Sequence, residues 1–531
     1  MSWNPFRRRE DEEPAQQAAA HDAAAAAPSM PADDDPTDPL INVASYREES
    51  ETIQRWDGMR LERVSIGTGD AADGFLKLVL EQGGAVADAL PGILLEGGAM
   101  FGLRDLLADD TAVLSAALEP VDLGFREFSA GIESGQLRVR VLDILNAMHD
   151  LATGFARCEA GGLGWRLNAD ALGFCRRLDT APAGWQLRFT GFGELQPGEP
   201  TDASEIVTLL RPLVDSLLAA PKLLPAANIA TELDRLLDGL QNNAGLSLGM
   251  LASEIQRCLH RIRLEGHATT DNGMRRQHNE DAWLMLDMRQ HSAIGSSLSI
   301  AAVADGMGGH ESGEIASSLA LAMLRQQLQA ALTAPSTRTQ DTGVLPMQLA
   351  TIIPGINRAL IERSAIDAAL AGMGTTLCGF VMLGSGSTLS SDTTASSAVF
   401  NVGDSRCYLV TAQSLKRITR DHSFVQELVD NGSVSEDEAF DHPRKNVITR
   451  CLGGDGLEIQ ADVYSFRPGP CERLLICSDG LSDALRDSEI AAVLAANAQA
   501  SLAVTAQALV DAANAAGGPD NITVLLLDCR L

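Results

Sequence analysis

The sequence predicts an α+β protein built from more than one domain. The chain has 531 residues, which is too long for a single hydrophobic core. Hydrophobic residues make up 45% and charged residues 21%, the balance of a folded globular protein. Short apolar runs typical of strands occur beside longer stretches with apolar residues at helical spacing, so both kinds of element are expected.

Changes in composition divide the chain into three parts. Residues 1–40 are rich in Ala, Pro, Asp and Gln and are predicted to be a disordered tail. Residues 41–262 are predicted to form a separate N-terminal domain of mixed α/β structure. Residues 263–531 are predicted to form a second domain, because apolar strand-like runs ending in Asp-Gly turns begin there.

Each half has its own expected elements. In the N-terminal half, strand-like runs such as FLKLVLE and WQLRFTGF alternate with helical stretches at 138–155, 205–218 and 248–264. In the C-terminal half, helices are expected at 311–332 and 347–370. The runs SLSIAAVAD, TTLCGFVML, AVFNVGD, RLLICSD and NITVLLLDC are expected to be buried strands of that half.

The net charge excludes some classes of partner. The chain carries 41 Lys and Arg against 71 Asp and Glu, a formal charge of −30. This balance argues against binding nucleic acid or an anionic membrane through bulk electrostatics. No apolar run reaches the ~18 residues of a membrane span, and no signal-peptide core follows the N-terminus, so we expect a cytoplasmic protein. The nine cysteines lie singly, as expected for reduced thiols there.

Acidic residues gather where strand-like runs end. They are Asp305, Asp404, Asp479 and Asp520, with the pair Glu280 and Asp281 after MRRQHN. One Asp-Gly after a strand is most often only a turn. Strand ends on one edge of a sheet can nevertheless bring distant carboxylates together, and divalent cations relieve the repulsion between them. Oxygen ligands without a His or Cys cluster favour Mg²⁺ or Mn²⁺ over zinc.

A series of sequence blocks carries a family resemblance. The blocks are R-x-x-N-E-D (Arg276–Asp281), VADGMGGHESGEIAS (Val303–Ser317), GMGTTL (Gly372–Leu377), VGDSR (Val402–Arg406), TRDHSFVQELVDNG (Thr419–Gly432), HPRKNVITRCLG (His442–Gly453), CSDGLSD (Cys477–Asp483) and GPDNITV (Gly518–Val524). In this order they resemble the metal-dependent protein phosphatases of type 2C in their bacterial form. The resemblance implies a C-terminal α-β-β-α sandwich, in which two antiparallel sheets are flanked by helices.

The resemblance also implies a first metal and its ligands. Asp305 is similar to the carboxylate that bridges two metals in the family, and the Gly306 carbonyl would bind one of them. Asp479 and Asp520 resemble the remaining ligands of the first metal. The implied cofactors are two ions of Mn²⁺ or Mg²⁺, with room for a third.

Four residues complete the site implied by the resemblance. Glu280 is similar to the acidic residue near the second metal, and Asp281 to its hydrogen-bonded neighbour. Asp404 matches the position that helps to hold a third, weaker metal together with Asp479. Arg276 would bind the substrate phosphate, since a guanidinium offers two parallel donors to two phosphate oxygens.

These roles imply a serine/threonine protein phosphatase that acts on phosphoproteins. A hydroxide held between two metals would attack phosphorus in line, while the metals and Arg276 offset the charge on the equatorial oxygens. The chain has no Cys-x5-Arg loop of a cysteine-nucleophile phosphatase. Met307 stands where animal members have a proton-donating His, so the general acid is either a metal-bound water or His310.

The segment Asp421–Gly453 resembles the flap beside the active site of the family. A mobile flap could select which phosphoprotein is accepted. We expect His422 and His442 to be part of the flap scaffold and to have no catalytic role.

Two alternatives concern the function as a whole. The C-terminal half could be a pseudophosphatase that only binds partners, or a phosphatase with one dedicated regulator as its substrate. The N-terminal half has a faint likeness to a degenerate protein kinase, with Gly191 where the metal-binding Asp would stand. An unrelated interaction domain is the favoured interpretation, and in either case this half is expected to bind a partner protein or to regulate the enzyme.

Overall fold

The structure is a computed structural model, and its described part is discontinuous. It covers residues 48–56, 59–66, 73–80, 103–108, 113–118, 121–160, 167, 169–177, 184–189, 201–219, 223–224, 226–260, 262–289, 297–308, 311–333, 344–384, 396–454 and 458–531. The predicted disordered tail, residues 1–40, lies outside these residues, as do Gly191 and His310. Within the described residues, no helix combines the length and apolar character needed to cross a membrane.

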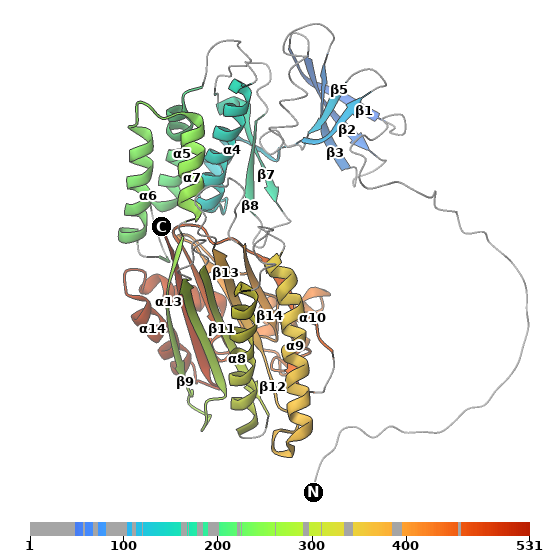
Figure 1. Ribbon diagram of the computed structural model, residues 1–531, viewed down its shortest axis with the longest axis vertical. Coiled ribbons are helices and arrows are strands. Elements are labelled where there is room, and N and C mark those ends of the chain that lie inside the picture. The colour runs from blue at the N-terminus through green and yellow to red at the C-terminus, as the bar shows by residue number, and fades with distance from the viewer. Residues whose placement is uncertain are drawn as a thin grey trace, which may run out of the picture.

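An antiparallel sheet forms the first described part of the chain (Figure 1). Its strands are β1 (Glu48–Trp56), β2 (Met59–Ile66), β3 (Asp73–Leu80), β4 (Leu103–Ala108) and β5 (Val113–Leu118). The strand order is β1-β2-β3-β5-β4. The run FLKLVLE, expected to be a strand, falls on β3.

A helical unit follows this sheet. Its elements are β6 (Leu123–Gly124), α3 (Phe125–Glu133), α4 (Val141–Ala160), the 3₁₀ helix η2 (Ala169–Ala171), β7 (Leu172–Arg177), β8 (Gly184–Phe189), α5 (Ala203–Leu218), α6 (Ala226–Gln241) and α7 (Leu248–His260). Strands β6, β7 and β8 form a small antiparallel sheet. The three predicted helices correspond to α4, α5 and α7, but α7 is shorter than expected. Leu264 continues the apolar helical spacing and lies instead in the following strand.

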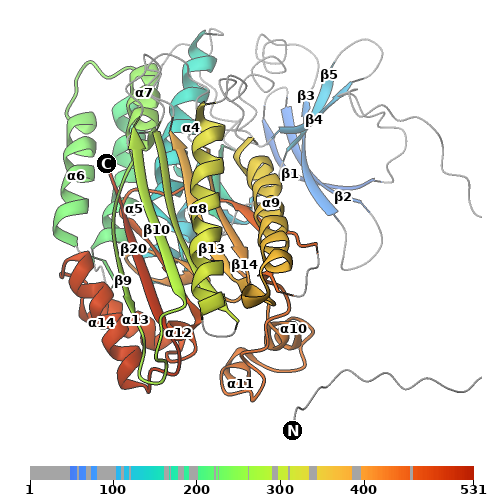
Figure 2. The ribbon, with the colours of Figure 1, turned by 60° about the horizontal axis from the view of Figure 1, so that its bottom comes forward.

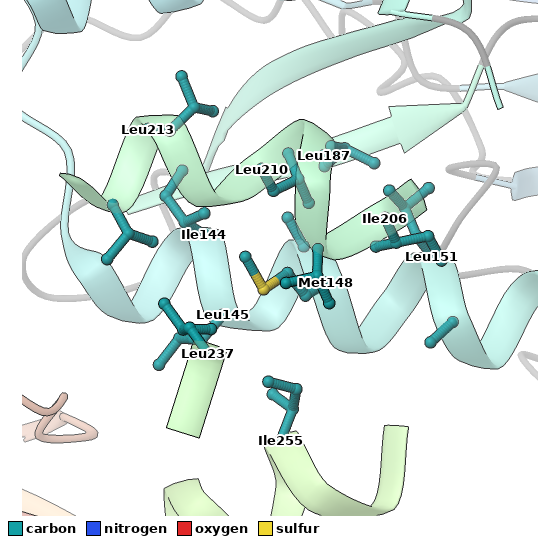
Figure 3. Packing of buried hydrophobic residues seen from close by; sticks show 14 of the residues in the cluster. Ile144, Leu145, Met148, Leu151, Leu187, Ile206, Leu210, Leu213, Leu237 and Ile255 are labelled. Atoms are coloured by element: carbon teal, nitrogen blue, oxygen red, sulfur yellow. The ribbon is translucent and has the colours of Figure 1, made fainter. Parts of the chain in front are cut away.

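Helix α4 provides the centre of the helical unit (Figure 3). Ile144, Met148 and Leu151 lie at helical spacing on its buried face and are shielded completely from solvent. They share one hydrophobic cluster with Ile206 of α5 and Ile255 of α7. Full burial of each such side chain contributes about 1.5–3 kcal/mol relative to exposure. The N-terminal half therefore has a core of its own.

Two antiparallel sheets make up the C-terminal half (Figure 2). One contains β10 (Asp281–Arg289), β11 (Ser297–Met307), β12 (Gly374–Thr375), β13 (Leu377–Gly384), β14 (Ser396–Val402), β17 (Leu452–Gly453) and β18 (Asp462–Ser465). The other contains β9 (Arg263–Asp271), β15 (Arg406–Val410), β16 (Leu415–Arg417), β19 (Glu472–Cys477) and β20 (Ile522–Arg530), in the order β16-β15-β19-β20-β9. The sheets pack through a shared cluster that includes Val303, Phe380 and Ile476.

Helices cover the outer faces of both sheets, which confirms the predicted α-β-β-α sandwich. Helices α8 (Glu311–Thr333) and α9 (Val344–Ile366) bury a second cluster against the first sheet. Helices α12 (Asp479–Ser482), α13 (Asp487–Ala496) and α14 (Leu502–Ala515) cover the second. Figure 2 shows α8 and α9 on one side and α13 and α14 on the other. The 3₁₀ helix η5 (Ala368–Leu370) ends the predicted helix at 347–370, and α10 (Phe424–Asp430) and α11 (Glu436–Phe440) lie in the predicted flap.

The helical unit and the sandwich are in direct contact. Leu223 and Leu224, which lie between α5 and α6, are buried in the same cluster as Tyr408 and Leu475 of the second sheet. The Leu223 amide donates to the Ala412 carbonyl at 3.3 Å. Apolar side chains thus cross the boundary that the sequence predicts at 262/263.

Candidate functional site

Strand register brings the first two predicted carboxylates together. Asp281 begins β10 and pairs directly with Asp305 near the end of β11. Because the two residues are paired across an antiparallel ladder, their side chains lie on the same face of the sheet. Asp305 is also held by Thr376, the residue between β12 and β13, since the Thr376 hydroxyl accepts from its amide at 2.9 Å and the Thr376 amide donates to its carbonyl at 2.9 Å.

The ends of strands in both sheets supply the remaining acids. Asp479 is the first residue of α12, directly beyond β19, and Asp404 follows β14. Asp520 precedes β20. All of these residues therefore reach the site from the same end of the strands, as strand-end acids were predicted to do.

Burial, and after it charge repulsion, raises the pKa values of four carboxyls in this site, those of Asp281, Asp305, Asp404 and Asp479. Burial raises the pKa of Asp281 to about 8 and that of Asp479 to about 7. Burial, together with the charges of Asp281 and Asp479, holds the pKa of Asp305 well above its usual value. Burial and the charge of Asp479 do the same to the pKa of Asp404. Four acids that disfavour their own ionisation in this way form a site that a cation would stabilise.

Unpartnered oxygens support the same conclusion. One carboxylate oxygen each of Asp281, Asp404 and Asp479 is buried and has no hydrogen-bond partner. A buried acceptor without a partner is costly, and a bound cation would satisfy it. The donor set consists of carboxylates and backbone carbonyls, which suit a hard cation such as Mg²⁺ or Mn²⁺. The residues present therefore fit the implied metals.

The carboxylates are not arranged as a finished coordination sphere. Across the described residues, no three His, Cys, Asp or Glu side chains are placed so that they could hold an ion as they stand. Asp305 is hydrogen-bonded to Asp479, and Asp520 is paired with Arg276. Rotation of these side chains changes their spacing but leaves the buried oxygens of Asp281, Asp404 and Asp479 in need of a partner.

Arg276 lies beside the acidic group, on its exposed side. Its Nη2 donates to Asp520 Oδ2 at 2.6 Å, and half of its side chain remains exposed. This hydrogen bond is the main reason that the pKa of Arg276 is raised. The charges of Glu280 and Asp305 act in the same direction, so the guanidinium is within electrostatic reach of the predicted metal ligands.

Several residues that hold the site escaped the sequence analysis. Asn521 accepts from the Glu280 amide at 2.9 Å and donates to the carbonyls of Asn272 and His278, so it ties β20 to the loop that carries Arg276. The hydroxyls of Ser478 and Thr523 donate to Asp281, at 2.7 and 2.6 Å. Asn521 and Ser478 lie within the blocks GPDNITV and CSDGLSD, but only the fold shows which partners these side chains bind.

Two glycines permit the close approach of backbone at the site. A Cβ built at Gly306 would lie 2.2 Å from the Gly313 carbonyl oxygen, and one at Gly480 would lie 2.0 Å from the Asn521 carbonyl oxygen. No side chain fits at either position. The Gly306 carbonyl, predicted to bind metal, is thus held by tight packing of its own backbone.

The predicted flap encloses a cavity beside these acids, here called the flap cavity. It has a volume of about 260 Å³ and is lined by residues of the flap, of α12 and α13, and of the β14–β15 turn. Its acidic lining residues are Asp404, Asp421, Glu436, Asp437, Asp479, Asp483 and Asp487, and its basic ones are Arg406, Lys445 and Arg486. Carboxylates therefore outnumber cations in the lining.

The two flap histidines make structural contacts. His422 is buried, its Nδ1 accepts from the Gly403 amide at 3.0 Å, and its Nε2 lies 3.2 Å from Asp462. Burial lowers the pKa of His422 below its usual value. His442 Nδ1 accepts from the Arg444 amide at 3.1 Å. These contacts are those of a scaffold.

Comparison with known proteins decides the family. Residues 270–514 match the family described as protein phosphatase 2C. The serine/threonine phosphatase stp of Listeria welshimeri is 35% identical over 265 residues, which cover 49% of this chain and 94% of that protein. The chain belongs to the protein phosphatase 2C family. It is therefore a serine/threonine protein phosphatase, as its sequence blocks implied.

Other members of the 2C family match the same share of the chain. The serine/threonine protein phosphatase PstP of Mycobacterium tuberculosis is 34% identical over 261 residues, which cover 49% of this chain and 44% of that protein. A crystal structure of the M. tuberculosis PstP/Ppp covers 51% of this chain and 100% of its own, with 32% identity and a TM-score of 0.40. A PstP catalytic domain in complex with two manganese ions has 33% identity and a TM-score of 0.39, over 51% and 100% of the two chains.

Proposed function

We propose that this 2C phosphatase hydrolyses phosphoserine and phosphothreonine in cytoplasmic phosphoproteins with the help of two divalent cations, Mn²⁺ or Mg²⁺. The observation that carries the proposal is the group of buried carboxyls whose oxygens lack partners, on Asp281, Asp404 and Asp479. When bound, a pair of such cations supplies a hydroxide near neutral pH that attacks the phosphorus, and it offsets charge on the phosphoryl oxygens. The nine free cysteines agree with a reducing compartment.

The ligands are divided between the two sheets. In this proposal Asp305 of the first sheet would serve both cations and the Gly306 carbonyl one of them, while Asp479 and Asp520 would complete the first ion from the second sheet. Glu280 and Asp281 serve the second ion, directly or through hydrogen bonds. Asp404 and Asp479 provide a weaker third position.

Arg276 binds and orients the phosphate group in this proposal. Its half-exposed guanidinium is held at the edge of the acidic group by Asp520. With Asp520 engaged by a cation, the guanidinium would be free to donate two parallel hydrogen bonds to the phosphate. The general acid in this proposal is a water molecule or His310, because the Met307 side chain carries no proton that it could donate to the leaving oxygen.

The N-terminal half is proposed to regulate the enzyme or to recruit its substrate. Support comes from the buried contact between the helical unit and the sandwich, in which Leu223 and Leu224 enter the cluster beneath β15 and β19. Strand β19 runs from this contact to the residue before Ser478 and Asp479. A change in the helical unit can therefore reach a proposed metal ligand along one strand.

Hydrolysis of a chromogenic phosphate ester by the full chain tests the proposal. Wild-type protein is expected to require Mn²⁺ or Mg²⁺, to lose activity in EDTA and to regain it with Mn²⁺. Asp305→Asn removes a charge at nearly constant volume and is expected to abolish activity, whereas Asp511→Asn, on the exposed face of α14, should leave it unchanged. Asp511 accepts a hydrogen bond from Gln507 at the surface.

Each alternative predicts a different outcome of this experiment. Activity that survives chelation would remove the metal assignment. A well-folded chain that binds Mn²⁺ but hydrolyses neither the ester nor any phosphopeptide would be a pseudophosphatase. Ester hydrolysis with rejection of all but one phosphoprotein would indicate a phosphatase with a single dedicated regulator.

A further inference from the structure

We propose that the flap cavity binds a lysine or arginine side chain of the substrate, so that the enzyme prefers phosphorylation sites with a basic residue nearby. This inference rests on the proposed phosphatase function and specifies its substrate class. Three features of the cavity carry it: its continuity with the acidic site, the engagement of its cations, and the position of two further carboxylates.

The flap cavity opens directly onto the proposed metal ligands. Asp404 and Asp479 belong both to its lining and to the acidic site. Asp404 is only 7% exposed, and its Oδ1 is buried without a hydrogen-bond partner. A phosphorylated residue bound at the acids therefore places its neighbours along the substrate chain at the mouth of the cavity.

Every cation in the lining is already engaged by a carboxylate of the protein. Arg406 forms a two-pronged contact with Asp421, through Nε at 2.9 Å and Nη2 at 2.7 Å. Lys445 lies 3.5 Å from the carboxylate of Asp483 and donates to its carbonyl at 2.9 Å.

Arg486 is engaged in the same way by the flap itself. It contacts Asp437 at 3.3 Å and Asp441 at 2.6 Å, and its guanidinium stacks over the Phe440 ring at 4.2 Å. These pairs leave the lining without a cation that could attract an acidic substrate segment. A negatively charged neighbour of the phosphate would instead meet uncompensated carboxylates.

Two carboxylates of the lining are available to a ligand. Glu436 of α11 is 81% exposed and its nearest cation, Arg417, is 3.8 Å away. Asp487 of α13 is 51% exposed and lies 3.7 Å from Arg406. One belongs to the flap and the other to the catalytic core, so a cationic side chain between them would be held from both sides. A cavity of about 260 Å³ has room for one long side chain.

The charge of the whole chain favours the same class of substrate. A formal charge of −30 attracts cationic segments over a distance, and this attraction weakens as salt rises. The electrostatic field of the net charge raises the rate at which basic substrates associate. The carboxylates of Glu436 and Asp487 select for a basic side chain at the cavity.

The test compares phosphothreonine peptides that differ at one residue. Each pair carries Arg or norleucine at one position within four residues of the phosphothreonine, and kcat/KM is measured with Mn²⁺ for the full chain at low and high salt. We expect wild-type enzyme to favour the Arg peptide about fivefold at the best position, mainly through KM, as for one favourable ion pair. The preference should shrink in 0.5 M NaCl.

Variants then assign the preference to the cavity. Glu436→Gln alone and the double variant Glu436→Gln/Asp487→Asn are expected to reduce the Arg-to-norleucine ratio stepwise towards one. Asn at 487 retains an oxygen for the Tyr408 hydroxyl, which donates to Asp487 at 2.9 Å. The matched control Glu427→Gln/Asp511→Asn removes the same charges outside the cavity lining and should keep the wild-type ratio.

The ratio of kcat/KM for the Arg peptide to that for the norleucine peptide is unaffected by a general loss of activity in a variant, because such a loss lowers both values equally. A wild-type ratio near one, a preference for the norleucine peptide, or a preference for Arg that persists in both Glu436 variants would overturn the inference. Ester hydrolysis by the wild-type chain is measured in parallel. If the ester is hydrolysed while the ratio is near one, only this inference fails; if neither ester nor peptide is hydrolysed, the proposed function itself fails.

Discussion

Arg140 and Glu472, 332 residues apart in the sequence, form a two-pronged ion pair between the helical unit and the sandwich. Nε and Nη2 of Arg140 each lie 2.7 Å from a carboxylate oxygen of Glu472. The side chains are only 11% and 2% exposed. Arg140 also donates to the Arg467 carbonyl at 2.6 Å, and the Gly469 amide donates to Glu472 at 2.7 Å. All of these bonds lie in one intramolecular interface that is largely shielded from solvent.

Arg140→Ala is expected to lower the free energy of unfolding by about 3–5 kcal/mol, because it leaves the buried Glu472 carboxylate without its cation. Denaturant unfolding of the full chain measures the change. Arg126→Ala is the matched control, since Arg126 pairs with Asp170 at the surface, where the side chains are 79% and 58% exposed, and should cost less than about 1 kcal/mol. Equal effects of the two substitutions would contradict the buried interface.

Leu224→Ala is expected to destabilise the sandwich as well as the helical unit. Leu224 is 3% exposed and packs in the cluster of β15 and β19, so truncation should cost about 2–5 kcal/mol. Thermal unfolding reports on the whole chain. The rate of phosphate-ester hydrolysis, measured at temperatures near the unfolding transition, reports on the sandwich. Met347→Ala, at a 72% exposed position, serves as the control. If the Leu224→Ala variant loses catalytic activity at the same temperature as the wild-type chain, the two halves are not coupled.

Arg276→Ala is expected to raise KM for a phosphopeptide more than tenfold while changing the Mn²⁺ requirement much less. The reason is the proposed role of its guanidinium as a phosphate ligand, which acts on substrate affinity. Arg276→Lys should give an intermediate KM, because an ammonium cannot supply two parallel donors. Steady-state kinetics at several Mn²⁺ concentrations separates the two effects. A large rise in the Mn²⁺ requirement with an unchanged KM would show that Arg276 only positions Asp520.

Stability is expected to depend on pH through Asp143, which is buried beside Arg140. Burial raises the pKa of this carboxyl to about 6 from 3.8, although the charge of Arg140 opposes the shift. The folded state therefore retains a proton that the unfolded state releases. The stabilising effect is complete below about pH 4 and is lost as the pH rises through 6, with a total of about 3 kcal/mol.

Comparison with Asp143→Asn isolates this contribution. Between pH 5 and pH 7.5 the wild-type chain should lose about 1 kcal/mol more of its unfolding free energy than the variant, which cannot ionise at this position. Denaturant unfolding at the two pH values measures the difference. A parallel pH dependence of wild type and variant would mean that Asp143 ionises normally in the folded chain.

The sequence carried enough information to predict the sandwich and most of its acids. Asp305 and Asp479 each end an apolar run, and such runs become strands whose ends meet at one edge. The two long helices of the C-terminal half were also predicted close to their observed bounds. These features depend on local periodicity and turn residues, which a sequence displays directly.

Other features depend on contacts between distant residues and could not be predicted. Nothing near Arg140 indicates that its partner is Glu472, and nothing near Leu224 indicates that it packs on the second sheet. The hydrogen bonds of Asn521 to the loop of Arg276 arise only from the pairing of β20 with β9. Composition predicts a boundary at 262/263, but it does not predict the packing of Leu223 and Leu224 across that boundary.

The pairing of β9 with β20 has a consequence for synthesis of the protein. The strand that opens the catalytic fold finds its neighbour in the strand translated more than 250 residues later, between Ile522 and Arg530. A nascent chain on the ribosome therefore lacks an inner strand and the acid at 520 until that stretch has emerged. A premature stop codon shortly before Asp520 would consequently yield an aggregation-prone product with an unpaired strand edge. Such a product would have no phosphatase activity, instead of a reduced one.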